Sequence, residues 1–290
     1  MSRPRPAFAA LAAVAALLAA CGGDDPPPTP DEPPAELLAT AFDNPPASGQ
    51  VDLDAEVELD GESLIAGGVA VDAGGPFAAA ARGELPRFAL AGEAEVAGFG
   101  VDGELISTGT DAFVVFFGEN YQVGEERIAQ AGARWSDFAA QSGPLGSQAA
   151  SWFVSPRYED AEEVDGTETQ RIDAELDGAR AGADIAAIAR AAGAPAFVEP
   201  LAAGAGEGTA QAWVAFEDKT LRRLRVEFPF TVPRAAQASA AGVRGGAASF
   251  EIELSDLGEE VDIEPPPGGG FQPIEQLIDR IMSFASLGGL

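Results

Sequence analysis

The sequence predicts an α+β fold built on one antiparallel sheet of about 9–11 strands, with a few helices across its apolar face. Segments such as Val51–Leu59 alternate apolar and acidic side chains, which is typical of a strand with one buried and one solvated face. Glycine-rich turns separate these segments about every ten residues, as in a meandering sheet. A few segments have helical periodicity instead, and we expect them to lie on the apolar face of the sheet.

The N-terminus has the organisation of an export signal. Two arginines lie in Met1–Pro6, and an unbroken apolar run follows from Ala7 to Ala20. A helix over this run would be about 21 Å long, which is shorter than the bilayer core of about 30 Å. Leu18-Ala19-Ala20-Cys21 resembles the bacterial lipobox, which implies that Cys21 becomes the first residue and carries a diacylglyceryl group. We therefore expect an extracytoplasmic protein anchored to the cell membrane by lipidated Cys21; the alternative is an ordinary signal peptide with a chance cysteine.

Composition excludes several functions. The chain has no histidine and one cysteine, so Ser-His-Asp and Cys-His triads, histidine-ligated zinc and disulfides are excluded. A net charge of −30 repels nucleic acid, so we expect no nucleic-acid partner. The acidic residues are interpreted as a solubility coat, with an acidic binding surface as the alternative. There is no EF-hand loop, and pairs such as Glu125-Glu126 are ordinary solvated charges, so we expect no metal, no cofactor and no enzymatic activity.

The first half of the chain predicts a tether followed by strands. Residues 22–34 are proline-rich and extended, and residues 35–42 form a short helix before Asn44-Pro45-Pro46. Gly74-Gly75-Pro76 is expected to turn the chain, and Gly100–Gly103 to interrupt it. The apolar run Ala112–Phe117 predicts a central strand covered on both faces. The other strands are predicted at 51–59, 64–71, 87–96 and from 104 to 107.

The second half predicts two longer helices among further strands. The helices lie at 126–140 and 183–192, a docked segment at 151–153, and a flexible loop at 202–208. Strands are expected in a hairpin over 158–176, over 211–232, over 248–254 and at 261–263. Pro229 and Pro233 remove ladder donors, which favours an edge position for the strand that contains Pro229.

The tail is an amphipathic helix over 273–285, because its apolar residues recur at helical spacing. Packing onto the sheet is the favoured interpretation, and membrane binding is the alternative. The predicted organisation is a signal peptide at 1–20, lipidated Cys21 and a tether to 34, one carrier domain at 35–267, and a glycine-rich linker with the C-terminal helix at 268–290.

A series of motifs resembles a known family. In chain order they are Ser48–Leu53, Gly75–Phe77, Glu84–Phe88, Gly118–Val123, Glu163–Ile172, Trp213-Val214 with Asp218–Leu224, Glu253–Glu259 and Ile263–Pro266. They resemble actinobacterial lipoproteins of the LppX/LprG type, whose fold is similar to that of LolA and LolB. Arg171 stands where the family commonly has histidine. The resemblance implies a curved half-barrel sheet, closed on its open side by helices around a hydrophobic cavity for acyl chains.

The predicted ligand is therefore a lipid or acylated molecule that the protein carries or presents in the cell envelope. The alternative is a structural or sensory lipoprotein that binds protein partners through its acidic surface. Strand alternation gives the expected cavity walls, which could equally form a filled core. These residues are Val57, Leu59, Phe88, Leu90, Val96, Leu224, Val226, Phe228, Phe230, Phe250, Ile252 and Leu254.

Overall fold

The computed structural model describes residues 30–61, 68–80, 85–96, 99–142, 149–192, 198–240, 242–277 and 279–280. Cys21, the predicted signal peptide and most of the predicted tether lie outside these residues. The chain from Glu32 onward forms one compact unit.

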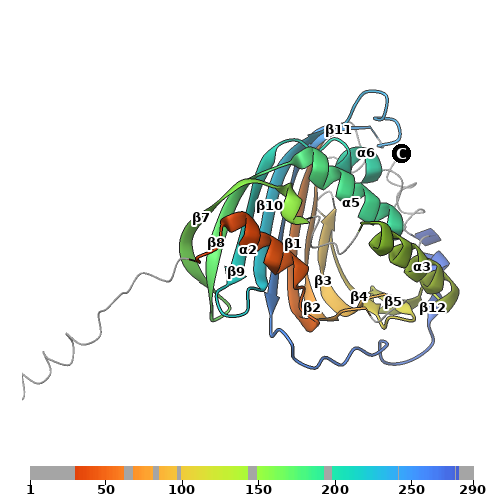
Figure 1. The fold of residues 1–290 in the computed structure, drawn as a ribbon. Coiled ribbons are helices and arrows are strands. Elements are labelled where there is room, and N and C mark those ends of the chain that lie inside the picture. The colour runs from red at the N-terminus through yellow and green to blue at the C-terminus, as the bar shows by residue number, and fades with distance from the viewer. Residues whose placement is uncertain are drawn as a thin grey trace, which may run out of the picture. The chain divides into compact units, whose positions relative to one another are not determined.

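A single sheet of 12 strands dominates this unit, in the order β12-β6-β5-β4-β3-β2-β1-β11-β10-β9-β8-β7 (Figure 1). All neighbours are antiparallel except β12 and β6, and the two end strands do not pair, so the curved sheet stays open. The predicted α+β class is confirmed, with one strand more than expected. The strands are β1 (Ser48–Gly61), β2 (Val69–Ala78), β3 (Arg87–Val96), β4 (Phe99–Ser107), β5 (Ala112–Phe116), β6 (Glu119–Gln122), β7 (Phe153–Val164), β8 (Thr167–Leu176), β9 (Gly208–Ala215), β10 (Leu221–Thr231), β11 (Val243–Ser255) and β12 (Gln272–Pro273).

The helices lie across one face of the sheet (Figure 1). They are α2 (Pro34–Asp43), α3 (Glu125–Ser142), the 3-10 turn η1 (Ala150–Trp152), α5 (Gly178–Ala192) and α6 (Val198–Ala202). Helix α2 begins with a proline that has no amide hydrogen to leave unpaired, and it carries an acidic residue in its first turn. The predicted helices at 35–42, 126–140 and 183–192 are thus confirmed within a few residues.

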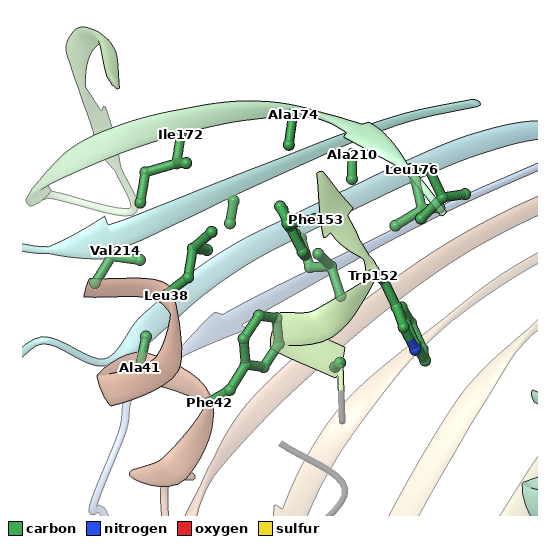
Figure 2. Packing of buried hydrophobic residues seen from close by; sticks show 14 of the residues in the cluster. Leu38, Ala41, Phe42, Trp152, Phe153, Ile172, Ala174, Leu176, Ala210 and Val214 are labelled. Carbon is green, nitrogen blue, oxygen red and sulfur yellow. The ribbon is translucent and has the colours of Figure 1, made fainter. Parts of the chain in front are cut away.

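Helix α2 fills one end of the sheet's concave face. Its Leu37, Leu38, Ala41 and Phe42 are buried against the apolar side chains of β8, β9 and β10 (Figure 2). Trp152 and Phe153 close the same cluster and confirm the predicted docked segment. The cluster also contains Ile172, Ala174, Leu176, Ala210, Ala212, Val214, Leu224 and Val226.

The C-terminal segment wraps around the β6 edge. Val261, Ile263 and Phe271 cover Ile106 and Phe113 on one face of β4 and β5, with the Phe113 and Phe271 rings 4.9 Å apart. After β12 pairs with β6, Ile274 and Leu277 pack against Tyr121 on the opposite face. Residues 274–277 are helical, so the preferred interpretation of the tail is confirmed for this part, while its other apolar positions lie outside the described residues.

Two predicted interruptions are wrong. Gly74-Gly75-Pro76 and Gly100–Gly103 lie inside β2 and β4, where pairing continues. A Cβ on Gly75 would lie 2.0 Å from the Ala89 carbonyl oxygen, so glycine is needed for close strand approach rather than for a turn. Pro76 is not paired with a residue of β3, so the N–H that proline lacks is not needed for that ladder.

Two predicted strand positions are also wrong. Strand β10 is not an edge strand, because it lies between β9 and β11. At Pro229, the neighbour on the β9 side is the loop before β9, whose Gly206 amide donates a hydrogen bond to the Pro229 carbonyl. β5 is third from the sheet edge rather than central, although its two faces are covered as expected.

Two other segments differ from expectation. Residues 261–263 form no strand but an extended cover over β4 and β5. The loop at 202–208 is held to β10 by backbone hydrogen bonds at Pro229 and Thr231, so it is not a free loop.

Candidate functional site

Strand register separates the sheet into two chemically distinct faces. Residues directly opposite each other in an antiparallel pair point to the same face. One row runs across six strands through Leu224, Ile252, Leu53, Ala73, Gly92 and Gly103. The face that carries this row, on which Leu224 packs against α2, is called the inner face.

The adjacent row points to the outer face and is charged. It runs through Arg225, Glu251, Asp54, Asp72, Glu93 and Asp102. Five carboxylates therefore stand on adjacent strands, and this row explains the acidic alternation that the sequence shows.

The inner face is filled at its β8–β10 end. Leu224 and Val226 are buried in the cluster beneath α2, and Phe228 and Phe250 pack against that cluster. Phe230 is buried in a second cluster, with Val57 and Leu59 packed against it. Seven of the predicted wall residues therefore contact the packed core: Val57, Leu59, Leu224, Val226, Phe228, Phe230 and Phe250.

The inner face over β11 and β1–β4 is covered less completely. Its side chains are half-buried, and Leu105 on β4 is 43% exposed. We call this region the central inner surface; its residues are Val51, Leu53, Ala55, Val71, Ala73, Leu90, Ala94, Val101, Leu105, Ile252 and Leu254. Three predicted wall residues, Leu90, Ile252 and Leu254, belong to it. Phe88 lies half-buried beside it, opposite Phe77 and Ser107, and the side chain of Val96 lies outside the described residues.

Small residues cross the middle of this surface. Ala73, Gly92 and Gly103 are neighbours on three adjacent strands. A Cβ on Gly92 would lie 2.0 Å from the Asp72 carbonyl oxygen, so strand packing itself requires glycine there. A Cβ on Gly103 would lie 3.2 Å from the nearest atom, so steric crowding is milder at that position. Either way, the row leaves no bulky side chain between its flanking leucines and valines.

The outer face offers a different environment. An open groove of about 550 Å³ crosses β1, β9, β10 and β11 and is lined in part by Glu56, Glu58, Arg225 and Glu227. Arg223 donates to Glu253 at 2.9 Å on the same face. A groove with this many charges does not suit an acyl chain, because burying the carboxylates under it would cost free energy.

Charge on the inner side gathers at the β6 edge. The Tyr121 hydroxyl donates to Glu119 at 2.6 Å, and Arg280 also donates to Glu119. These two hydrogen bonds hold the pKa of Glu119 below its ordinary value, and the bond to Glu119 raises the pKa of Tyr121. Arg127 on α3 pairs with Glu275 at 2.6 Å, so the C-terminal segment is tied to both α3 and the sheet.

Two classes of site are not found in the described part of the chain. There is no group of three or more histidine, cysteine, aspartate or glutamate side chains placed to hold a metal. No described helix is both long and apolar enough to span a bilayer.

Sequence reasoning missed part of the central inner surface. Val71, Val101 and Leu105 were not among the predicted wall residues, although the same alternation applies to their strands. The expected break at Gly100–Gly103 hid the pattern on β4, where Val101 and Leu105 flank Gly103 on one face.

Comparison with known proteins gives structural similarity only. No protein-family profile matches the sequence, and no curated protein sequence matches it. Among solved structures, the chain is similar to LprF from Mycobacterium bovis, with a TM-score of 0.48, 18% identity and coverage of 81% of this chain and 97% of that one. The Mycobacterium tuberculosis lipoprotein LppX gives 0.43 and 15%, covering 79% and 97%. A LolA-superfamily protein from Nitrosomonas europaea gives 0.20 and 9%, covering 79% and 94%.

Proposed function

We propose that the central inner surface binds the acyl chains of a lipid or lipidated molecule. The protein would be anchored through lipidated Cys21 and would carry or present that molecule in the cell envelope. The observation that carries the proposal is the contrast within one face: the same alternating pattern is buried under α2 but half-exposed over β11 and β1–β4.

Apolar area left accessible to water forgoes stabilisation of about 25 cal/mol per Å². A contiguous surface of this kind marks a binding site more often than isolated exposed residues do. The rows of the central inner surface contain no charged residue, so an acyl chain lying on them would leave no charge unpaired.

The surface also has a suitable extent. β11 and β4 are separated by four strand spacings, or about 19 Å at about 4.8 Å each. Over β2–β4, the row through Ala73, Gly92 and Gly103 carries the smallest side chains of this surface. We also propose that an enclosed cavity forms over this surface when the ligand is bound.

Native mass spectrometry of the domain without its lipid anchor tests the proposal. We expect a copurifying lipid on the wild-type domain and a smaller bound fraction in Ala73→Phe, which places a ring over the small-residue row. Ala70→Phe is the matched control, because Ala70 lies on the same strand but is exposed on the outer face. A wild-type mass free of lipid, also after incubation with lipid vesicles, would contradict the proposal. That result would leave the alternative of an envelope lipoprotein that binds protein partners.

A further inference from the structure

The hairpin that joins β5 to β6 carries an exposed aromatic residue at its tip. Phe116 pairs with Glu119, and Phe117 and Gly118 form the two-residue connection. Phe117 is 73% exposed, more than the other exposed large apolar residues of the described chain, Leu105 and Val154. Its ring contacts the Phe116 ring, with centroids 4.6 Å apart.

The backbone at this tip disfavours phenylalanine. The φ angles of Phe117 and Gly118 are 50° and 73°, so both residues are left-handed, as a type I′ turn requires. This conformation favours asparagine, aspartate or glycine, and a bulky residue is strained in it.

The same chain provides an internal comparison. The β7–β8 hairpin turns through Asp165 and Gly166, with φ angles of 46° and 71°. That turn has the same geometry and a preferred residue at its first position. Turn formation therefore does not explain Phe117, and its exposure shows that core packing does not explain it either.

Charge at the tip is also compensated. Glu119, the residue after the turn, is paired with Arg280 and hydrogen-bonded to Tyr121. Phe116, the residue before the turn, packs on the cluster of Tyr121, Ile274 and Leu277. The tip is thus an exposed apolar side chain on a well-packed hairpin, and the carboxylate beside it, that of Glu119, is paired with Arg280.

We infer that Phe117 contacts the membrane surface and orients the anchored domain on it. This inference rests on the anchoring part of the proposed function, since Cys21 places the bilayer within reach of the domain. Phenylalanine is among the apolar side chains that interfacial segments bury at the boundary between lipid headgroups and acyl chains. One phenylalanine cannot hold a protein on a bilayer, because even a single acyl chain gives only marginal binding. Linked to an anchor, however, the same contact becomes intramolecular and can select an orientation.

Site-specific fluorescence on the anchored chain tests the inference. Cys21 is the only cysteine, so Phe117→Cys offers a single reactive thiol once Cys21 is lipidated, and the aromatic dye coupled to it takes the place of the phenyl ring at the tip. The thiol is labelled with an environment-sensitive nitrobenzoxadiazole dye, and the chain is reconstituted into phosphatidylcholine vesicles. Asp165→Cys is the control at the turn of equal geometry. We expect the emission at position 117 to increase at least twofold and to be quenched by spin-labelled lipids, with no change at position 165.

Equal, solvent-like emission at the two positions on vesicle-bound protein would overturn the inference. A change at position 117 that follows protein concentration without vesicles would overturn it in favour of a second copy of the chain. Failure of the lipidated chain to bind vesicles at all would instead count against the anchor, which separates the two hypotheses. The native mass spectrometry experiment tests lipid binding to the central inner surface on the domain without its anchor, so its result does not depend on these fluorescence measurements.

Stability provides a second measurement. Because Phe117 is strained and exposed, Phe117→Asn should raise the melting temperature by about 2–4 °C while removing the membrane contact. A lower melting temperature would show that Phe117 is needed for the fold, and would overturn its assignment to the membrane.

Discussion

Asp54 on β1 lies directly opposite Asp72 on β2, and Asp72 lies directly opposite Glu93 on β3. Like charges that face each other across strands destabilise a sheet. The outer face therefore lowers the stability of the strands whose inner face carries the proposed binding surface.

Asp72→Lys should stabilise the protein by about 0.5–1 kcal/mol, because it replaces two repulsive cross-strand pairs with attractive ones. Urea unfolding at low and high salt measures the effect. Added salt should stabilise the wild type more than the variant, since it screens the repulsion. Glu260→Lys, in the exposed coil after β11, is the control for net charge. An equal gain in this control would assign the effect to total charge rather than to the row.

The two regions of the inner face should respond differently to truncation. Leu38→Ala removes an α2 side chain that is 1% exposed, and we expect a loss of about 2–4 kcal/mol. Leu105→Ala removes one that is 43% exposed, and we expect less than about 1 kcal/mol. Denaturant unfolding of the lipid-free domain compares them. Similar losses would mean that Leu105 is packed as tightly as the core, and would remove the support for an open central surface.

The β6 edge should lose stability in acid. The pKa of Glu119 is lowered by hydrogen bonds from Tyr121 and Arg280, so folding favours its ionised form. Its contribution is present above the ordinary value of 4.5 and is lost as the pH falls through the lower folded-state pKa. Glu119→Gln should therefore destabilise the protein at pH 7 more than at pH 3. Thermal melts at the two values measure this difference, with Glu260→Gln as the control; a pH-independent effect of Glu119→Gln would contradict it.

Alternation was sufficient to predict the sheet and its two faces. In Val51–Leu59 and in β10, every second side chain points to the inner face, as the pattern requires. Pairing partners were not available from the pattern, because they join residues far apart in the sequence. The pattern around Gly75 therefore predicts a turn, although the role of this glycine depends on Ala89 of the neighbouring strand.

The candidate site shows the same limit. Alternation predicts that Leu90 and Leu224 face inward, but it does not indicate which of them α2 covers. Leu224 is buried beneath that helix, whereas Leu90 is only half-buried. Whether a side chain on the inner face is buried depends on where a helix docks, and the sequence pattern of a strand does not indicate the position of that helix.

The wrapped C-terminal segment has a consequence for synthesis. Ile274 and Leu277 pack on Tyr121 of β6, and β11 pairs with β1. A nascent chain therefore leaves both the β1 and the β6 margins of its first half unprotected until the last strands emerge. Contacts so distant in sequence form slowly, and unpaired margins promote association between chains.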